Sequence, residues 1–365
     1  MKRFSGFIVL LLLFGLLTGC NTKTPSAENP SSEKEPSGSF EISLSQAELE
    51  KQAPSTLAAY TAAQTKADAS VAKAVLLSQK EIIEESSYPD RYVSYETEDG
   101  SHLTVTVYGS VSYVTNHYLE KLDNIVKRRS SYLEPVENSA FFSSEENLPF
   151  MSQEEAGKTA ATLCRTLGFG DISVRQIYVM DQESLQQNLE TVPEDELYHF
   201  NKETEEAVPI TLSYTEEDDC YFLLLQNDVG NLSVLSSPHG NPDDDSYIGG
   251  FDGLLVLSER GVELLQISGH MSVEEKEEVQ PLFPADKALT EVKNKFEQLL
   301  SCPPTTVERG DLVYVPEIID RNAGRYRLVP AWCFSIRQQL TDITGSVMEQ
   351  ESVVLIHAFT GDEII

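Results

Sequence analysis

The segment SQEEAGKTAATLCRTLG, residues 152–168, predicts an amphipathic helix with a defined start and end. Ser152 and Glu155 have the spacing of a capping box, in which each side chain bonds the backbone N–H of the other residue. Gly168 supplies a C-terminal stop. The apolar residues between them recur at three- and four-residue spacing and share one helix face: Ala156, Ala160, Leu163, Cys164 and Leu167.

Strand-like segments follow this helix, and most are rich in β-branched and aromatic residues. They are residues 172–180, 210–214, 221–226, 253–257 and 262–267, and the last two flank the turn Glu259-Arg260-Gly261. An antiparallel sheet of this kind has one face that a helix can cover. We therefore expect the helix to bury its apolar face against these strands.

The final part of the chain repeats this pattern in shorter form. Pro284 marks a helix start, and Pro303 and Pro304 prevent the helix from continuing. An apolar stripe lies between them: Ala285, Ala288, Leu289, Val292, Phe296, Leu299 and Leu300. Strand-like segments follow at residues 306–315, 326–336 and 353–359. The sequence thus predicts two α+β units of one design, residues 150–280 and 281–365.

The preceding residues, 45–149, predict an additional N-terminal α+β unit. From residue 45 to about 80 the chain is rich in Ala and has apolar residues at helical spacing, which predicts one or two helices interrupted near Pro54. A hairpin follows, because residues 92–95 and 103–107 flank the turn dipeptide Asp99-Gly100.

The first 20 residues have the order of a secretory signal. Lys2 and Arg3 precede the apolar run 7–17, which is about half the ~20 residues that a bilayer-spanning helix needs. The ending LTGC, residues 17–20, resembles the lipobox of bacterial lipoproteins. That resemblance implies cleavage before Cys20 and lipidation of its sulfur. A conventional secreted protein whose signal merely contains a cysteine is the alternative.

Residues 20–44 separate the predicted signal peptide, residues 1–19, from the first folded unit. The segment 21–40 is rich in Pro, Ser, Glu and Asn and has almost no apolar side chains, so it cannot bury enough surface to offset its ordering entropy. We predict a disordered tether. Together with several lipid chains on Cys20, this tether would hold the folded part on the extracytoplasmic face of the cell membrane.

The charge of the chain makes some partners improbable. The 59 acidic residues against 27 basic residues give a formal net charge of -32 at pH 7. Such a chain is a poor partner for free nucleic acid, and it would not adhere to anionic lipid by charge. Membrane contact is therefore predicted to occur through the lipid alone.

No local motif indicates catalysis or cofactor binding. The sequence lacks G-x-S-x-G, H-E-x-x-H, P-loop and dinucleotide-binding patterns. The six histidines stand singly: His102, His117, His199, His239, His270 and His357. We predict that these are structural histidines and that the chain has no catalytic residue, metal or cofactor.

Four cysteines remain behind the anchor: Cys164, Cys220, Cys302 and Cys333. Outside the cytoplasm an even number permits two disulfides, with three possible connectivities. In the repeat interpretation, Cys164–Cys220 and Cys302–Cys333 would be equivalent helix-to-strand bridges. Free buried cysteines, which pack as small hydrophobic residues, are the alternative.

Two loops, residues 227–231 and 239–245, offer clustered oxygen ligands of the kind that calcium prefers. Their spacing departs from the EF-hand pattern, and acidic runs also occur at 216–219 and 274–278, where no site is expected. The acidic residues are therefore predicted to be solvated surface, with a calcium site as the alternative. Trp332 lies in an apolar strand and is predicted to pack in the core, not against a ligand.

The C-terminal segment resembles PepSY-like and YycH/YycI-type modules. In those families a strand with a Pro-Ala-Trp core precedes a last strand of the form apolar-x-Ala-x-Thr-Gly-Glu-apolar. In this chain the Pro-Ala-Trp motif is at residues 330–332. The positions of the last-strand pattern are occupied by Ala358, Thr360, Gly361, Glu363 and Ile364, and Asp362 is an insertion relative to that pattern. The chain also looks like large uncharacterised lipoproteins of Firmicutes that carry such a domain behind an acidic, Ser-rich tether.

This resemblance implies cystatin-like units, in which a helix packs on an antiparallel sheet. Relatives of this build mostly contact another membrane-associated protein, such as a sensor kinase, a protease or a cell-wall enzyme, and the resemblance supplies no catalytic residue. We therefore predict a non-enzymatic lipoprotein that binds or regulates an envelope protein. Two alternatives stay open: a small-ligand-binding lipoprotein that serves a transporter, and an envelope hydrolase with an unrecognised site.

Overall fold

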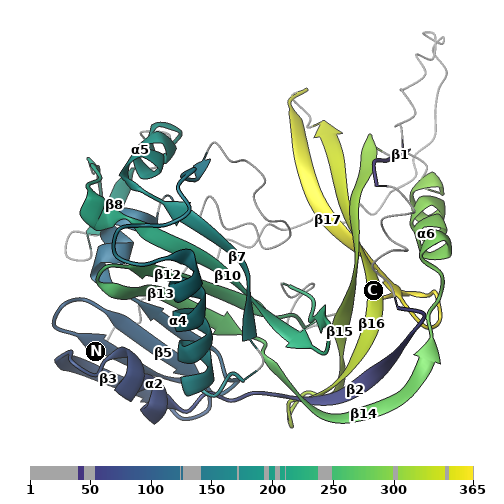
Figure 1. Ribbon diagram of the computed structural model, residues 1–365, viewed down its shortest axis with the longest axis horizontal. Coiled ribbons are helices and arrows are strands. Elements are labelled where there is room, and N and C mark those ends of the chain that lie inside the picture. The colour runs from purple at the N-terminus through teal and green to yellow at the C-terminus, as the bar shows by residue number, and fades with distance from the viewer. Residues whose placement is uncertain are drawn as a thin grey trace, which may run out of the picture. The chain divides into compact units, whose positions relative to one another are not determined.

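Two β-sheets, whose strands run mostly antiparallel, form the body of the protein in the computed structural model (Figure 1). The structure describes residues 40–44, 54–123, 125, 141–170, 172–192, 197–201, 206–209, 211–236, 249–298, 303–341 and 345–364. The α+β class predicted from the sequence is confirmed. No described helix is long and apolar enough to cross a membrane.

The larger sheet has nine strands. Its order is β11 (Leu232–Ser233), β10 (Cys220–Val229), β12 (Asp252–Ser258), β13 (Gly261–Ser268), β6 (Val111–Val114), β5 (His102–Thr106), β4 (Tyr92–Thr97) and β3 (Ile82–Tyr88), and β7 (Ile172–Met180) pairs with β10. The predicted hairpin is present as β4 and β5.

This sheet crosses the boundary that the sequence predicted between residues 149 and 150. Strand β6 pairs antiparallel with β13, with Val114 opposite Leu264 and Val111 opposite Ile267. The N-terminal hairpin strands therefore have no separate sheet. Local periodicity indicates where a strand lies, but it does not indicate which other strand forms hydrogen bonds with it. Here the partner of β6 is β13, about 150 residues away in the chain.

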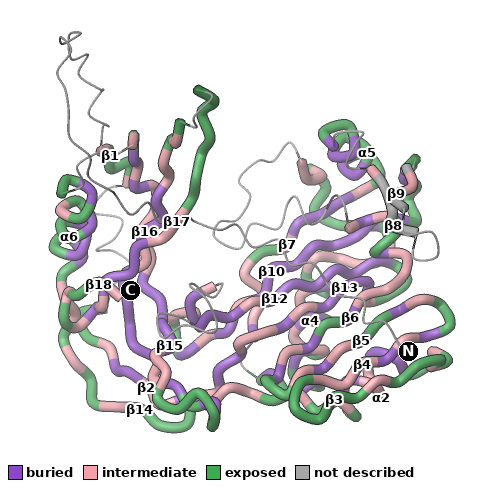
Figure 2. The backbone as a smooth tube through the Cα atoms, turned by 180° about the vertical axis from the view of Figure 1, so that it is seen from behind, coloured by how far each residue is buried: buried purple, intermediate pink, exposed green. Residues whose placement is uncertain are grey.

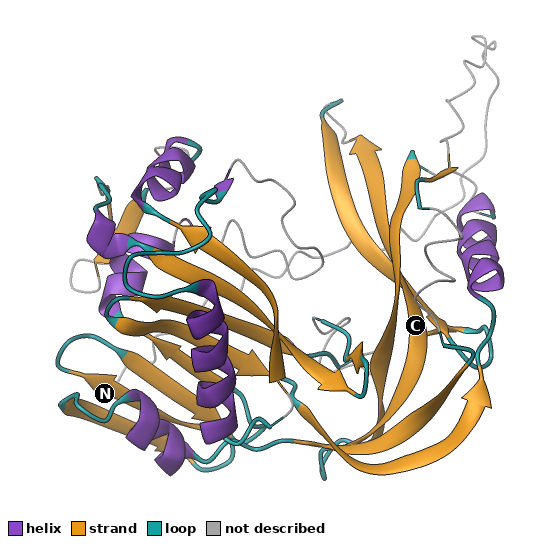
Figure 3. Cartoon of the chain, viewed as in Figure 1, coloured by secondary structure: helices purple, strands orange, loops and turns teal. Residues whose placement is uncertain are grey.

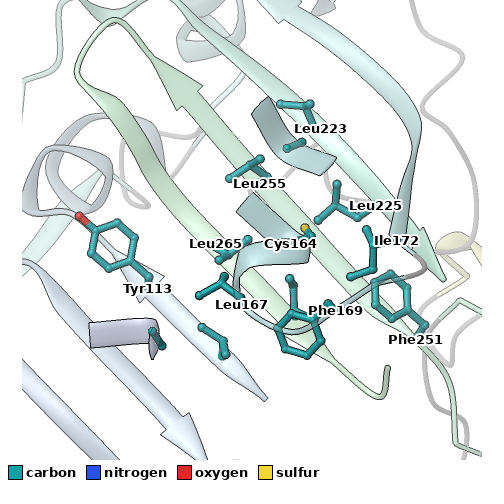
Figure 4. Close-up of a cluster of buried hydrophobic side chains, with 14 of the residues drawn as sticks. Tyr113, Cys164, Leu167, Phe169, Ile172, Leu223, Leu225, Phe251, Leu255 and Leu265 are labelled. Atoms are coloured by element: carbon teal, nitrogen blue, oxygen red, sulfur yellow. The ribbon is translucent and has the colours of Figure 1, made fainter. Parts of the chain in front are cut away.

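Helix α4 (Gln153–Thr166) covers one face of the nine-stranded sheet (Figure 3). The predicted capping box is present: the Ser152 hydroxyl accepts from the Glu155 N–H at 3.2 Å, and the Glu155 carboxylate accepts from the Ser152 N–H at 2.9 Å. Gly168 follows the helix with a φ of 94°. The helix end and the sheet share one apolar cluster (Figure 4), which includes Cys164, Leu167, Leu223, Leu225, Leu255 and Leu265.

The second sheet has seven strands. Its order is β1 (Phe40–Ile42), β15 (Thr305–Asp320), β16 (Arg325–Thr341), β17 (Val347–His357) and β18 (Glu363–Ile364), and β2 (Thr56–Gln64) pairs with both β16 and β14 (Met271–Pro281). Only the β1–β15 pairing is parallel among the described strands of this sheet. Because β2 and β14 both belong to it, this sheet also crosses the boundary predicted between residues 280 and 281.

Helix α6 (Ala285–Glu297) packs on one face of the seven-stranded sheet, and its buried residues share a cluster with β15, β16 and β17. Trp332 lies in this cluster with 2% of its surface exposed, and its indole N–H donates to the carbonyl of Phe283 at 3.0 Å. The prediction that Trp332 packs in the core is confirmed.

The Ala-rich segment at the start of the chain departs most from prediction. Residues 57–60, predicted to be helical, belong to strand β2, and the helix is limited to α2 (Ala69–Leu76), capped by Asp68. Ala58, Ala59 and Ala62 are almost completely buried in the sheet. Pairing with β14 and β16 therefore overrides the helix propensity of alanine. Residues 45–53 lie outside the described part of the chain.

Smaller differences concern the region between α4 and β10. Helix α5 (Gln182–Glu190) was not predicted, although Asp181 caps it with a side-chain bond to the Ser184 N–H. The predicted strand 210–214 is absent from the described residues 211–215, and a short hairpin precedes them, formed by β8 (Tyr198–Asn201) and β9 (Glu206–Pro209). The segment after His117 begins with a short π-helical turn, Tyr118–Leu122.

A short segment after β10 joins the two sheets. The N–H of Leu235 donates to the carbonyl of Tyr314 in β15 at 2.8 Å, and the hydroxyl of Tyr314 donates to the carbonyl of Ala58 in β2 at 2.9 Å. Figure 2, in which buried residues are purple, shows that burial concentrates in the strands of both sheets. Residues Gly38–Ile365 accordingly form one compact unit.

Candidate functional site

The residues singled out in the sequence do not meet in one site. Cys20, Cys302 and the acidic loop 239–245 lie outside the described residues. Cys164, Cys220 and Cys333 are free thiols.

The predicted Cys164–Cys220 disulfide is not formed, because the two side chains lie on opposite faces of the nine-stranded sheet. Cys164 belongs to the cluster under α4, whereas Cys220, the first residue of β10, belongs to the cluster on the other face. Burial raises the pKa of Cys164 to about 12 and also raises the pKa of Cys220, so both thiols stay protonated at neutral pH. The partner predicted for Cys333, Cys302, is not among the described residues.

We expect alkylation in denaturant without reductant to label Cys164 and Cys220 completely, because neither forms a disulfide. Under native conditions both should resist labelling, since they are buried and protonated. Peptide mass spectrometry measures both results. A fraction of either cysteine that becomes reactive in denaturant only after reduction would contradict the free thiols.

The acidic loop 227–231 has a structural role at its first residue. The side-chain oxygen of Asn227 accepts from the N–H of Met271 at 2.9 Å, which joins the end of β10 to the start of β14. No group of three or more His, Cys, Asp or Glu residues in the described ranges is arranged to hold a metal ion. A calcium site at residues 239–245 stays an untested alternative.

An ionic cluster whose two carboxylates are buried forms around His117, which follows β6. Its Nε2 lies 2.8 Å from Asp218 of the turn before β10, and its Nδ1 lies 3.2 Å from Glu263 of β13. Arg260, from the β12–β13 turn, reaches Glu263 at 2.9 Å through its Nε and contacts the His117 ring nitrogens through its terminal nitrogen. We name these four residues the His117 cluster. It contains two acidic groups and two basic groups.

Glu263 is the centre of this cluster and has only 1% of its surface exposed. Ser258 donates to one carboxylate oxygen at 2.7 Å, and the hydroxyl of Thr115 donates to the other. Burial alone would raise the pKa of Glu263. The hydrogen bonds from His117, Ser258 and Thr115 outweigh burial and lower this pKa to about 2. The carboxylate is therefore ionised, with partners on both oxygens.

The neighbouring pKa shifts have the signs expected of ion pairs. Burial lowers the pKa of His117, but the bonds to Glu263 and Asp218 outweigh burial and raise it. Burial likewise raises the pKa of Asp218, and the bonds from His117 and Thr215 lower it below its usual value. With His117 protonated, the positive and negative charges of the cluster balance. This geometry suits a structural role, in which the ion pairs hold three segments of the nine-stranded sheet together. Both ring nitrogens of His117 already have contacts within the cluster.

A hollow of about 460 Å³, with both apolar and charged lining residues, lies at the His117 cluster, and His117, Arg260 and Glu263 are part of its lining. Its lining includes a second ion pair, in which the Lys80 Nζ lies 2.5 Å from Asp99, the hairpin residue of β4–β5, and donates to Ser101 at 3.0 Å. Sequence reasoning missed both groups, since the residues of each ion pair come from segments that are separated along the chain. The available signal was that the β4–β5 and β12–β13 turns both carry charged residues, at Asp99 and at Arg260.

We expect His117→Gln to destabilise the protein most in mildly acidic solution. The pKa of His117 is higher in the folded protein than its value of 6.5 in the unfolded chain. The stability that His117 contributes is therefore fully present below pH 6.5, and it is lost as pH rises through the folded-state pKa. The lowered pKa of Glu263 acts in the opposite direction, because its contribution is present above 4.5 and is lost as pH falls toward about 2. The cluster therefore stabilises most between these two unfolded values.

Urea unfolding at about pH 5.5 and about pH 8.5 measures this effect as the difference in unfolding free energy between the wild type and the variant. The control is His102→Gln, which removes a histidine that bonds the carbonyl of Tyr95 and no carboxylate. A difference for His117→Gln that stays constant or grows toward alkaline pH would contradict the ionic role.

Another hollow, of about 400 Å³, lies between the two sheets. It is lined by β7, β10 and β11 on one side and by β15, β16 and β17 on the other. Two arginines, Arg175 of β7 and Arg309 of β15, are among its lining residues. We name this hollow the inter-sheet pocket.

No protein-family model matches the chain, and no curated protein matches it. Among solved structures, the chain resembles the crystal structure of an uncharacterized protein from Eubacterium rectale. The two share a TM-score of 0.61 and 15% sequence identity, over 90% of this chain and 91% of that chain. At this identity the likeness shows a common fold and carries no statement about function.

Proposed function

We propose that the protein is anchored through lipidated Cys20 on the extracytoplasmic face of the membrane and acts there as a non-enzymatic regulator or binding module of an envelope protein. We further propose that its C-terminal parts are two PepSY-like, cystatin-like units. Two observations support the units: α4 packs on the strands β7, β10, β12 and β13, and α6 packs on β15, β16 and β17.

The open edge of β17 is the observation that carries the contact function. One side of β17 pairs with β16 along its whole length, from Val347 opposite Thr341 to His357 opposite Ala331. On its other side β18 pairs only with Leu355 and Ile356. Within the described residues, positions 347–354 therefore present backbone groups that no strand pairs.

The side chains on this edge also favour contact. Val347 and Met348 are 64% and 53% exposed, although they are apolar. Exposed edge strands are usually shielded by charged residues, and Glu349 and Glu351 are such residues in β17. The apolar end of the edge, at Val347 and Met348, is the surface that favours addition of a strand from a partner. Val353, farther along the same strand, lines the inter-sheet pocket. A strand added to β17 would therefore run from the exposed end of the sheet toward that pocket.

The described cysteines and histidines give little support to the hydrolase alternative. Burial raises the pKa of all three described thiols, Cys164, Cys220 and Cys333, so each stays protonated at neutral pH, and the ring of His117 is bonded to carboxylates on both nitrogens. The small-ligand alternative is favoured by one observation, the inter-sheet pocket with its two arginines.

The anchor is tested by changing Cys20 to Ser in the full chain. We expect the wild type to incorporate a labelled fatty acid and to sediment with membranes, whereas Cys20→Ser should do neither, because no helix among the described residues is long and apolar enough to span the membrane in place of the lipid. Cys333→Ser is the matched control and should behave like the wild type. Equal membrane recovery of Cys20→Ser and the wild type would contradict the anchor.

The edge of β17 is tested by a proline that removes one outward N–H. The N–H of His357 donates to Asp362 on the β18 side, and that of Ala358 donates to Pro330 on the β16 side. Because backbone groups alternate along a strand, the N–H of Glu349 points away from β16. Glu349→Pro should therefore preserve the pairing with β16 while preventing strand addition.

The measurement is photo-crosslinking in intact cells from a reactive residue placed at Met348. We expect the crosslink to one envelope protein to fall by about tenfold in Glu349→Pro, the effect of one lost hydrogen bond and a steric clash. Glu349→Ala is the control, because it loses the same contact with Arg337 but keeps the N–H. Equal crosslinking by the two variants would exclude strand addition at β17.

A further inference from the structure

The inter-sheet pocket brings two arginines together, beside Asp228 and Asp311, in a chain whose formal net charge is -32. Its two guanidinium groups come from different sheets, since Arg175 belongs to β7 and Arg309 to β15. Arg309 lies next to a register shift in the β15–β16 pairing, and its Nε lies 2.7 Å from the carboxylate of Asp311. The charge of Arg309 is thus compensated within its own strand.

Arg175 differs from Arg309 in this respect. It is half-buried, and across the described part of the chain no carboxylate forms an ion pair with its guanidinium. Burial, followed by the positive charge of Arg309, lowers the pKa of Arg175, and the negative charge of Asp311 opposes this shift without cancelling it. A partly desolvated cation beside a like charge costs the folded state free energy unless an anion compensates it.

The remaining lining of the pocket suits a small polar ligand. Hydroxyl and amide groups come from both sheets: Ser233, Ser236, Ser335, Gln226 and Asn231. The second carboxylate of the lining, Asp228, accepts a hydrogen bond from Ser173 at 2.5 Å. Among the described residues Arg175 is therefore the arginine of the pocket that forms no ion pair with a carboxylate, although the charge of Asp311 acts on it from a distance.

We propose that the inter-sheet pocket binds a small ligand through a carboxylate or phosphate group held by Arg175, with Arg309 beside it. A guanidinium presents two parallel N–H donors that match the oxygens of either group. Desolvation strengthens this bond, and the serine and amide side chains bind the polar body of the ligand. This site is separate from the contact at β17, and neither proposal requires the other.

The proposal predicts opposite effects of Arg175 on stability and on binding. Replacing Arg175 with Met keeps the aliphatic stem and removes the charge, so the thermal midpoint of the unliganded protein should rise. The same change should weaken anion binding by at least about tenfold, the loss of a charge-assisted hydrogen bond. An arginine with a purely structural role would lower the midpoint when replaced.

The experiment measures thermal unfolding of the full chain in detergent, with acetate or inorganic phosphate titrated against sodium chloride at equal ionic strength. We expect at least one of the two anions to raise the midpoint saturably, and the comparison tells carboxylate from phosphate. Arg175→Met should show a higher midpoint without anion and a much weaker response to it. The matched control is Arg165→Met, which removes an exposed arginine of α4 and should leave the response unchanged.

Two results would overturn the proposal. One is a midpoint that neither anion raises beyond sodium chloride at matched ionic strength. The other is a lower midpoint for Arg175→Met in anion-free buffer, which would show that Arg175 stabilises the fold itself. Failure of the β17 crosslink leaves both readouts unaffected, so the two proposals fail separately.

Discussion

Tyr314 of β15 links the two sheets through the hydrogen bond that it accepts from Leu235, and its contacts with β2 hold it within the seven-stranded sheet. Tyr314 is 1% exposed, accepts from the N–H of Leu235, and donates its hydroxyl to the carbonyl of Ala58. Its ring also meets Tyr60 edge to face, with centroids 5.4 Å apart. These bonds fix the register of β15. A slip of one residue would turn Arg309 and Asp311 from the inter-sheet pocket to the face that α6 covers.

Local sequence patterns predicted the elements well where propensity and burial agree. Helices α4 and α6, the hairpin β4–β5 and the strands β10, β12, β13, β15 and β16 lie where periodicity and turn residues placed them, within a few residues at their ends. Strand β17 was predicted at residues 353–359 but spans Val347–His357, so its exposed first half was missed. Strand β2 was missed because its buried alanines at 58, 59 and 62 resemble a helix when their neighbours in the sheet are unknown.

Long-range pairing explains why the units and the candidate sites could not be predicted. The partners of β6 and β2 lie far along the chain, in β13 and β14, and no local pattern specifies them. The same applies to side chains: His117 and Asp218 are 101 positions apart, and Arg175 and Arg309 lie in different sheets. The common fold with the protein from Eubacterium rectale at 15% identity shows that such an architecture tolerates different side chains. Function has to be argued from the residues of this chain.

The two charged clusters differ in how completely the protein compensates them. In the His117 cluster each carboxylate is bonded and each ring nitrogen has a partner, so the buried charges stabilise one arrangement of three segments. In the inter-sheet pocket Asp311 forms an ion pair with Arg309, whereas Arg175 forms no ion pair with a carboxylate of the described residues and feels Asp311 only at a distance. Removing one member of the first cluster would leave a buried charge unpaired, whereas removing Arg175 would relieve a repulsion. The charge of Arg175, which faces a polar pocket, is therefore explained by a ligand. The charges of the His117 cluster, which complete a network of ion pairs, are explained by their role in the fold.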